Sequence, residues 1–313
     1  MTAPSDILPD AAPTNWVDRH APAALRPWLK LGRFDRPAGI WLLMLPGWQG
    51  IALAGAMKGE GPNLLLLAEV FAGAALMRAA GCAYNDIVDR DFDAQVARTA
   101  GRPIPSGQIS VKQAWAFVAA CCLVSLGVLL TMPLIAIGLG AGSLALVAAY
   151  PFMKRITWWP QAWLGLTFNW GALLGFAAAT GHVGWPAVLL YAGGVFWTLG
   201  YDTIYAVQDL EDDALAGVKS SALRLGSAAP QAVLGFYVIA FVLALAAAWV
   251  GGLGPLFLPL AAAYGVHLSR QAARLDVTDG AGALKLFKSN TTAGAVLFAA
   301  LVCGLWKGPG VGF

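Results

Sequence analysis

Apolar blocks of about 20 residues, separated by short polar segments, make up most of the sequence. A helix of that length covers the hydrocarbon core of a bilayer, which is roughly 30 Å thick. Only 12% of the residues are charged and 58% are hydrophobic, whereas about 25% of the residues of an ordinary soluble domain are charged. A single water-soluble core cannot absorb so many apolar residues. The sequence therefore predicts an all-α, polytopic membrane protein.

Hydropathy predicts nine transmembrane helices packed as a bundle. The expected spans are residues 37–57, 64–84, 114–132, 134–152, 160–180, 185–207, 231–250, 254–270 and 291–306. Residues 1–25 are expected to form a flexible polar lead-in, because they lack the charged-then-apolar pattern of a cleavable signal. Residues 26–313 are expected to form one transmembrane domain with two pseudo-repeats, at about 33–155 and 160–290.

Basic residues collect on one side of the predicted membrane. With nine spans the connecting segments alternate between the two sides, and most of the basic residues lie on the same side as the N-terminus. This set comprises Arg19, Arg26, Lys30, Arg33, Arg36, Arg90, Arg98, Arg102, Lys112, Lys154, Arg155, Lys219, Arg224, Arg270, Arg274, Lys285 and Lys288. The other side has Lys58 and Lys307, and Arg78 lies inside the second span. The positive-inside rule predicts a cytoplasmic N-terminus and a C-terminus on the outer, periplasmic side.

Two acidic clusters lie at cytoplasmic ends of predicted helices. In the first, Asn85, Asp89 and Asp93 are successive i,i+4 neighbours and Asp86 lies three residues before Asp89, so these four side chains are expected to share one helix face. In the second, Asp209 and Asp213 have the same spacing, and Asp202 lies two turns earlier. Each cluster precedes a basic loop that contains Gly and Ser. This weak repeat predicts that the two clusters face each other across one cavity.

The residue types in these clusters favour a divalent metal. Packed carboxylates repel one another, and the C-terminal end of a helix carries a negative partial charge that disfavours Asp. A bound cation would offset both effects, and hard oxygen donors suit Mg²⁺, which fills its other positions with phosphate and water. The alternative is that these carboxylates are merely solvated helix ends.

Basic residues beside the acidic clusters predict a diphosphate ligand. The cations expected to surround the oxygens that the metal leaves open are Arg98, Arg102, Lys154, Arg155, Lys219 and Arg224. No Walker A motif occurs, which disfavours a nucleotide. A site at the mouth of an apolar bundle favours a lipid diphosphate, although each basic residue alone could be a positive-inside anchor.

Several motifs resemble those of the UbiA superfamily of intramembrane prenyltransferases. They are RFDRPAGIWLLMLPG from Arg33, LMRAAGCAYNDIVDRDFD from Leu76, RTAGRPIPSG from Arg98, YPFMKR from Tyr150, GYDTIYAVQDLEDD from Gly200 and KSSA from Lys219. The resemblance implies a bundle around a central cavity that opens sideways to lipid. It also implies Mg²⁺ ligands at Asn85, Asp89, Asp93, Asp209 and Asp213, and a YxxxK element at Tyr150 and Lys154.

Within that superfamily, the sequence most resembles the bacterial members that prenylate 4-hydroxybenzoate in ubiquinone biosynthesis, which implies a protein of the cell inner membrane. The implied reaction attaches a prenyl group from a prenyl diphosphate ortho to the hydroxyl. Asp89 and Asp209 are the expected catalytic carboxylates, and Arg155 is the expected partner of the benzoate carboxylate. The substrate-binding set is completed by Arg33, Arg98, Arg102, Tyr150, Lys154, Asp202 and Lys219.

The expected partners are the two substrates and membrane lipid, with no nucleic acid and no obligate protein partner. A sister prenyltransferase with another aromatic acceptor is the nearest alternative. An ion-coupled transporter is the more distant one, because transporter carboxylates are expected near the membrane midplane rather than beside basic loops at one edge.

The predicted topology is open to a direct test. A reporter fused after Phe313 should lie on the periplasmic side, because nine spans place the two termini on opposite sides. Paired fusions of an alkaline phosphatase and a fluorescent protein measure this, since each is active on one side only. A cytoplasmic reading for the C-terminal fusion would mean that the number of spans is even.

Overall fold

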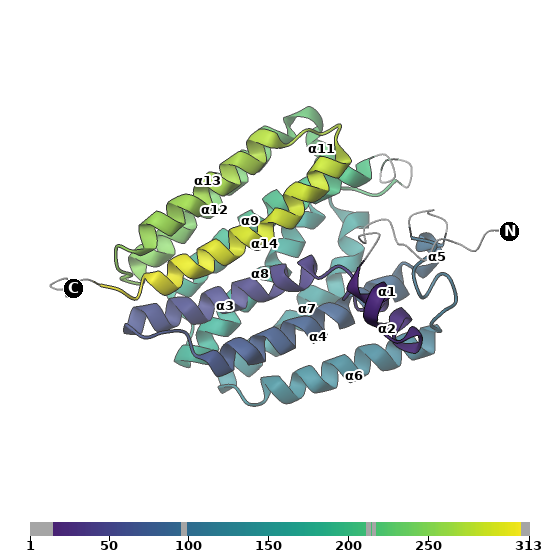
Figure 1. Cartoon of the computed structure of the whole chain (residues 1–313), viewed down its shortest axis with the longest axis horizontal. Helices are drawn as coiled ribbons and strands as arrows, with labels where there is room; N and C mark the ends of the chain where they lie inside the picture. Colours follow the sequence, from purple (N-terminus) through teal and green to yellow (C-terminus); the bar gives the residue numbers. More distant parts are fainter. Residues whose placement is uncertain (1–14, 95–98, 211–213, 215–216, 308–313) are drawn as a thin grey trace. The chain divides into compact units, whose positions relative to one another are not determined.

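The computed structural model describes residues 15–94, 99–210, 214 and 217–307. Every regular element in these ranges is a helix (Figure 1), so the predicted all-α class is confirmed. The chain divides into two compact units, which are described separately. Unit 1 contains residues 1–41 and 71–131, and unit 2 contains residues 42–70 and 132–313. These units do not coincide with the predicted pseudo-repeats, which stay a prediction.

Unit 1 contains short helices, one long helix and parts of two more. Its elements are α1 (Trp16–His20), η1 (Ala23–Leu25), α2 (Arg26–Leu31), the first turn of α3 (Ala38–Lys58), most of α4 (Leu64–Val88), α5 (Arg90–Asp93) and α6 (Val111–Leu129). Leu31, Ala83, Ile87, Ile104 and Ile109 form a buried cluster in it. This cluster fixes α2 and the loop before α6 against the end of α4 that carries the first acidic cluster.

The structure differs from the predicted flexible lead-in at residues 15–25. Asn15 caps α1 by accepting a hydrogen bond from the backbone of Asp18 at 3.0 Å. Val17 is fully buried, and Asp18 pairs with Lys30 of α2 at 2.8 Å. The sequence has no long apolar block here and suggested a mobile segment, but a helix cap, the buried side chains of Val17 and Ala21 and an ion pair hold residues 15–25 in place.

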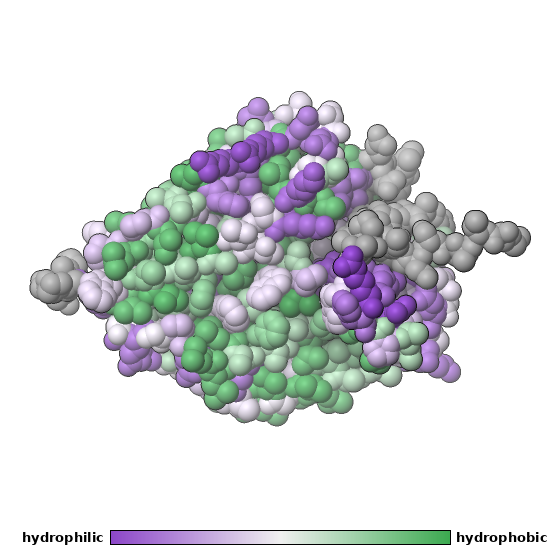
Figure 2. All heavy atoms as spheres, in the orientation of Figure 1, coloured by the Kyte–Doolittle hydropathy of each residue, from purple (hydrophilic) through white to green (hydrophobic). Residues whose placement is uncertain are grey.

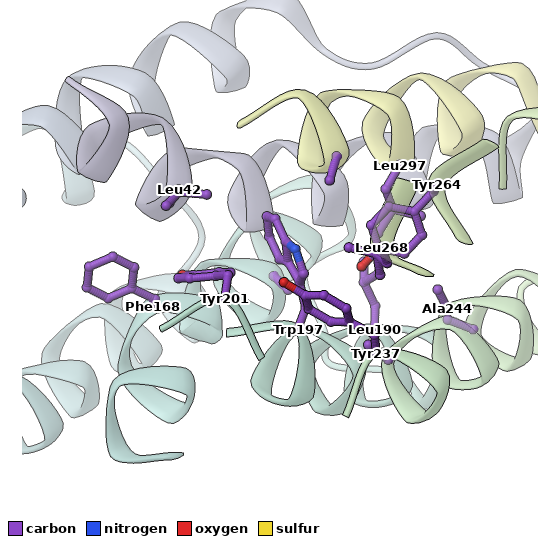
Figure 3. Packing of buried hydrophobic residues seen from close by; sticks show 14 of the residues in the cluster. Leu42, Phe168, Leu190, Trp197, Tyr201, Tyr237, Ala244, Tyr264, Leu268 and Leu297 are labelled. Atoms are coloured by element: carbon purple, nitrogen blue, oxygen red, sulfur yellow. The ribbon is translucent and has the colours of Figure 1, made fainter. Parts of the chain in front are cut away.

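Unit 2 contains the remaining long helices. Its elements are the rest of α3, the start of α4, α7 (Leu134–Ile156), α8 (Pro160–Thr180), α9 (Trp185–Ala206), η2 (Val207–Asp209), α11 (Ser221–Leu225), η3 (Gly226–Ala228), α12 (Ala229–Val250), α13 (Phe257–Arg274) and α14 (Gly280–Cys303). Trp197, Tyr201, Tyr237 and Tyr264 are almost completely buried in its core, and Figure 3 shows their rings between the helices.

Polar side chains inside unit 2 are paired across helices. Trp197 of α9 donates to Asn290 of α14 at 2.9 Å, and Tyr237 of α12 donates to Gln271 of α13 at 2.7 Å. Asn169 of α8 donates to Thr198 of α9 at 2.7 Å. An unpaired polar group is costly where no water is present. These bonds therefore hold neighbouring helices in one register.

Helices α3 and α8 cross at unusually close range because glycines line the contact. A Cβ added at Gly175 would lie 2.2 Å from the carbonyl oxygen of Gly47, and one added at Gly50 would lie 2.2 Å from that of Ala172. Small residues are the usual means by which membrane helices bring their backbones together. Neither position can carry a larger residue unless the two helices move apart.

The outer surface is apolar, as a lipid environment requires. Leu64, Leu134 and Trp249 are 77%, 83% and 85% exposed, and Figure 2 shows hydrophobic side chains over much of the visible surface of the long helices. Each predicted span coincides with a helix of at least 18 residues. Seven of the described helices are long and apolar enough to cross a membrane. This confirms a multi-pass membrane protein.

Helices α9 and α13 are not among these seven. Helix α13 carries Arg270, Gln271 and Arg274 in its last two turns and is the less apolar of the two, and α9 carries Asp202 near its end. The number nine for the spans therefore stays a prediction.

The glycine contact gives a stability prediction. Gly175→Ala should destabilise the protein by about 1–3 kcal/mol, because its Cβ would meet backbone rather than a movable side chain. An ordinary helical Gly→Ala change instead favours the helix by about 1 kcal/mol. Gly235→Ala in α12 is the matched control, since nothing lies within 4 Å of its added Cβ. Thermal unfolding in one detergent measures both, and equal melting temperatures would contradict the crossing.

Candidate functional site

The first acidic cluster lies where α4 ends and α5 begins. Two backbone bonds continue the helical path through this junction, from Asp89 N to Asn85 O at 2.9 Å and from Asp93 N to Asp89 O at 2.8 Å. The side chain of Asn85 donates to Asp89 at 3.2 Å. Asn85, Asp89 and Asp93 therefore share one face, as the i,i+4 spacing predicts.

Burial separates these residues from ordinary solvated helix ends. Asp89 and Asp93 are 1% and 4% exposed, and Asp86 is not exposed at all. By contrast, the side chain of Asp91 in the same cluster is 85% exposed. Burial raises the pKa of Asp93, and the nearby Asp86 and Asp89 charges add to this, while Arg102 opposes it. Carboxylates held in this way need compensating positive charge.

Two arginines supply part of that charge within unit 1. Arg33 Nη2 donates to both carboxylate oxygens of Asp86, at 2.6 and 2.9 Å. Arg102 Nη1 lies 2.7 Å from Asp93 Oδ2 and 3.3 Å from Asp86 Oδ1. The Asp86 charge raises the pKa of Arg33 although burial alone would lower it. Both arginines were predicted to bind substrate, and the structure gives them carboxylate partners.

The loop between α5 and α6 closes over the same cluster. The hydroxyl of Thr99 donates to the backbone carbonyl of Asp93 at 2.8 Å, and the Arg102 backbone N–H donates to Thr99 at 2.9 Å. Thr99 is 5% exposed. Arg98, also predicted to contact the diphosphate, lies outside the described residues.

The donors on this face fit a magnesium ion. Mg²⁺ is usually held by one or two carboxylates and takes its remaining ligands from phosphate and water. Asp89 and Asp93 supply two carboxylates, and Asn85 adds an amide oxygen. Three or more His, Cys, Asp or Glu side chains do not gather at metal-binding distance anywhere in the part of the chain that the structure describes. Asn85, Asp89 and Asp93 would therefore supply only part of the coordination of the ion, and phosphate oxygens of the substrate and water would supply the rest.

The second cluster begins in unit 2 at the end of α9. Asp202 lies on α9, but Asp209 lies on the 3₁₀ turn η2 rather than on the helix itself. The start of α14 packs on this turn, since a Cβ at Gly280 would lie 3.1 Å from the Cα of Gln208. Tyr205 stacks near Phe287 with ring centroids 4.6 Å apart. Asp213 lies outside the described residues.

Tyr150, Lys154 and Arg155 lie in the last two turns of α7. The loop that follows the second cluster is tied to this helix end, because Lys219 N donates to the Lys154 carbonyl at 2.9 Å. The Lys219 ammonium also donates to the Ile156 carbonyl, at 3.2 Å. Lys219, predicted to bind substrate, thus satisfies carbonyls that the helix leaves open.

A buried hydrogen-bond chain holds the start of α11 behind this loop. The backbone N–H of Ser221 donates to Gln161 at 3.0 Å, and the Ser221 and Thr203 hydroxyls lie 2.6 Å apart. Ser221 and Thr203 are fully buried. Helices α8, α9 and α11 therefore converge on the KSSA segment. The first cluster belongs to unit 1 and these elements to unit 2, so a shared cavity stays a prediction.

Arg78 is a candidate that the sequence reasoning left unassigned. It lies on α4 seven residues before Asn85, which is two turns closer to the start of the helix and on the same face. Its guanidinium covers the start of α3, since a Cβ at Gly39 would meet Arg78 Nε at 2.8 Å. A charged residue inside a membrane span is costly and is generally retained for function. That signal was present in the sequence.

Comparison with known proteins agrees with this arrangement. The chain is 47% identical over 291 residues to the Homo sapiens protein named 4-hydroxybenzoate polyprenyltransferase, mitochondrial, covering 92% of this chain and 78% of that one. Its structure is similar to the apo structure of a UbiA homologue from Aeropyrum pernix K1, with a TM-score of 0.70 and 28% identity over 84% of this chain and 96% of that one.

A second solved structure shares the fold. A UbiA homologue from Archaeoglobus fulgidus, described as bound to GPP and Mg²⁺, has a TM-score of 0.63 and 18% identity, covering 89% of this chain and 99% of that one. The model of the UbiA prenyltransferase family matches residues 43–306. This match includes most of α3, all of α4 to α14 and both acidic clusters. The chain belongs to the UbiA prenyltransferase family.

Proposed function

We propose that this chain transfers a polyprenyl group from a prenyl diphosphate to 4-hydroxybenzoate, at the ring carbon ortho to the hydroxyl, in ubiquinone biosynthesis. The observation that supports this is the face formed by Asn85 and the buried Asp89 and Asp93 at the end of a helix long and apolar enough to cross a membrane. The Homo sapiens relative, 47% identical over 92% of this chain, bears the name of this activity.

In the proposed reaction, the allylic C–O bond to the diphosphate breaks, a C–C bond to the ring forms and the ring carbon loses a proton. Bound Mg²⁺ would supply positive charge that stabilises the departing diphosphate. The choice of Mg²⁺ is supported by the donor set and by the Archaeoglobus fulgidus homologue described with that ion. Asn85, Asp89 and Asp93 would hold the metal from unit 1, and Asp209 and Asp213 from unit 2.

The remaining residues of the site would orient the acceptor and the diphosphate. Asp209 is the candidate to accept a hydrogen bond or a proton from the phenol, because it lies on a turn beyond α9 rather than within the helix. Lys154 and Arg155 at the end of α7 would face the diphosphate or the benzoate. The apolar exterior keeps the reaction in a membrane, where little water competes for the reactive prenyl group.

The orientation in the membrane is also part of this proposal. Both acidic clusters and the basic loops lie on the N-terminal side in the predicted topology, so the diphosphate would be bound at that surface. The Homo sapiens relative is named as mitochondrial, and it therefore does not support the predicted cell inner membrane. Fractionation of the source cells decides which membrane holds the chain.

Removing a metal ligand should abolish turnover. Asp89→Ala and Asp209→Ala should each lower kcat by roughly a hundredfold or more, since a catalytic metal is worth several kcal/mol in the transition state. Asp91→Ala is the control for Asp89→Ala, because that side chain is 85% exposed. Chelation of divalent ions should abolish the wild-type activity, and added Mg²⁺ should restore it. Near-wild-type rates for both ligand variants at saturating Mg²⁺ would refute the metal assignment.

Substitutions of two arginines test which residue binds the benzoate carboxylate. Arg155→Ala should lower kcat/KM for the acceptor by the equivalent of about 2–5 kcal/mol, the cost of losing one partner of a buried charge pair. KM for the diphosphate should change much less. Arg155→Lys should rescue only partly, because an ammonium cannot form a planar two-point contact.

Arg78→Ala is the matched comparison in the same assay. Seven residues separate Arg78 from Asn85 on α4, a distance of about 10 Å along the helix axis. Arg78 is the second candidate to bind the benzoate carboxylate. An acceptor-specific defect in Arg78→Ala alone would transfer the role to Arg78. A defect of Arg155→Ala confined to the diphosphate would assign that residue to the leaving group.

A further inference from the structure

Asp86 is the most deeply buried carboxylate of the first cluster. Its carboxylate contacts Arg33 at 2.6 Å and Arg102 at 3.3 Å, and it has no exposed surface. Asn85, Asp89 and Asp93 form the metal-facing row, and Asp86 is directed instead to two arginines from other segments. A buried carboxylate between two guanidinium groups is a poor metal ligand, because its lone pairs are already engaged.

The backbone at Arg33 indicates that its side chain has a specific role. Arg33 has a φ of 60°, and it is the one residue other than glycine with positive φ among the described residues. It occupies the position after the end of α2 where a left-handed residue closes the helix, with Phe34 N bonded to Leu29 O at 2.9 Å and Arg33 N to Lys30 O at 3.1 Å. Glycine is strongly preferred there, so arginine has a conformational cost that its ion pair must offset.

Arg102 connects the same carboxylate to the metal row. One of its nitrogens, Nη1, lies near both Asp86 Oδ1 and Asp93 Oδ2. Its contact with Asp93 is made through Oδ2. The loop that carries Arg102 is fixed by Thr99, which donates to the Asp93 backbone. Arg33, Asp86, Arg102 and Asp93 thus form a continuous ionic chain within unit 1.

We propose that Asp86 is a positioning residue: it holds Arg33 and Arg102 against α4, and through Arg102 it fixes the Asp93 carboxylate beside Asp89 for metal binding. In this arrangement Asp86 does not ligate the metal. It affects metal binding only by holding Arg33 and Arg102 in place. The inference rests on the proposed metal site of Asn85, Asp89 and Asp93 and adds the residues that preorganise it.

The test measures metal affinity rather than turnover. Mn²⁺ binding to the purified full-length chain in detergent is followed by electron paramagnetic resonance, with an unreactive prenyl thiolodiphosphate present to complete the site. Asp86→Asn should weaken Mn²⁺ binding by roughly 10- to 100-fold, the range typical of residues that orient metal ligands. Asp86→Glu should recover part of that loss. Asp91→Asn is the matched control and should bind as the wild type does.

A double-mutant cycle separates positioning from ligation. Arg102→Gln should weaken binding by a similar factor, and adding it to Asp86→Asn should give little further loss, because both changes break one ionic chain. Arg33→Gly is the variant most certain to fold, since glycine relieves the left-handed backbone while removing the guanidinium. It should weaken binding without lowering the melting temperature as far as Asp86→Asn does.

Each remaining outcome overturns the inference or its premise in a distinguishable way. Wild-type affinity in Asp86→Asn, or losses that multiply when Asp86→Asn and Arg102→Gln are combined, would overturn the positioning role. Complete loss in Asp86→Asn with wild-type binding in Arg33→Gly and Arg102→Gln would make Asp86 a ligand. If Asp89→Asn binds Mn²⁺ normally, the proposed metal site itself is wrong. A chain that binds metal as expected but does not prenylate 4-hydroxybenzoate would refute only the proposed substrate.

Discussion

A bilayer offers no water to buried polar groups, and the rest of this structure follows from that constraint. Every amide, hydroxyl or charge that the chain places inside must be satisfied by the protein itself. In unit 2 the pairs Trp197–Asn290 and Tyr237–Gln271 meet this requirement between helices. In unit 1 the same requirement places Asp86 against Arg33. The polar contacts therefore specify which helices are neighbours, while the apolar surface specifies only that they lie in lipid.

Close helix packing depends on residues that contribute no side chain. Lipid is as apolar as a leucine side chain, so burial of apolar surface gives little drive to bring membrane helices together. At the α3–α8 crossing, Gly47, Gly50 and Gly175 allow backbones to approach. Helix α8 packs in turn against α9. The glycine contacts therefore support the helix that carries Asp202 and leads into η2, where Asp209 lies.

The candidate site uses buried charge in two different ways. Asp89 and Asp93 form a buried acidic face, and its carboxylate oxygens are of the kind that suits a hard cation. Asp86 is neutralised by the protein, and its ion pairs fix segments distant in sequence. The proposed metal ligands and the residue proposed to position them thus lie side by side on one helix end, and the side chains around them distinguish the two roles. Removal of either kind would lower activity, so affinity and coupling measurements separate the two roles.

Local patterns in the sequence were sufficient for the fold class and for the acidic face. The helical repeat fixes i,i+4 neighbours wherever a helix forms, so Asn85, Asp89 and Asp93 were correctly placed together. Helix positions followed from apolar block length in the same way. Local patterns gave the end of α9 but not the 3₁₀ turn that carries Asp209, and hydropathy did not reveal the short capped helix α1.

Only the tertiary structure decided what the arginines contact. Arg33 and Asp86 are 53 residues apart, and nothing in either motif states that they meet. The sequence placed Arg102 and Lys219 near a diphosphate and Arg33 among the substrate-binding residues. Packing instead gives Arg33 and Arg102 to carboxylates and Lys219 to a helix carbonyl. The sequence by itself determined which residues share a helix face, because that depends on the helical repeat. Contacts between distant segments depend on how the helices pack. That packing cannot be read from the order of residues along the chain.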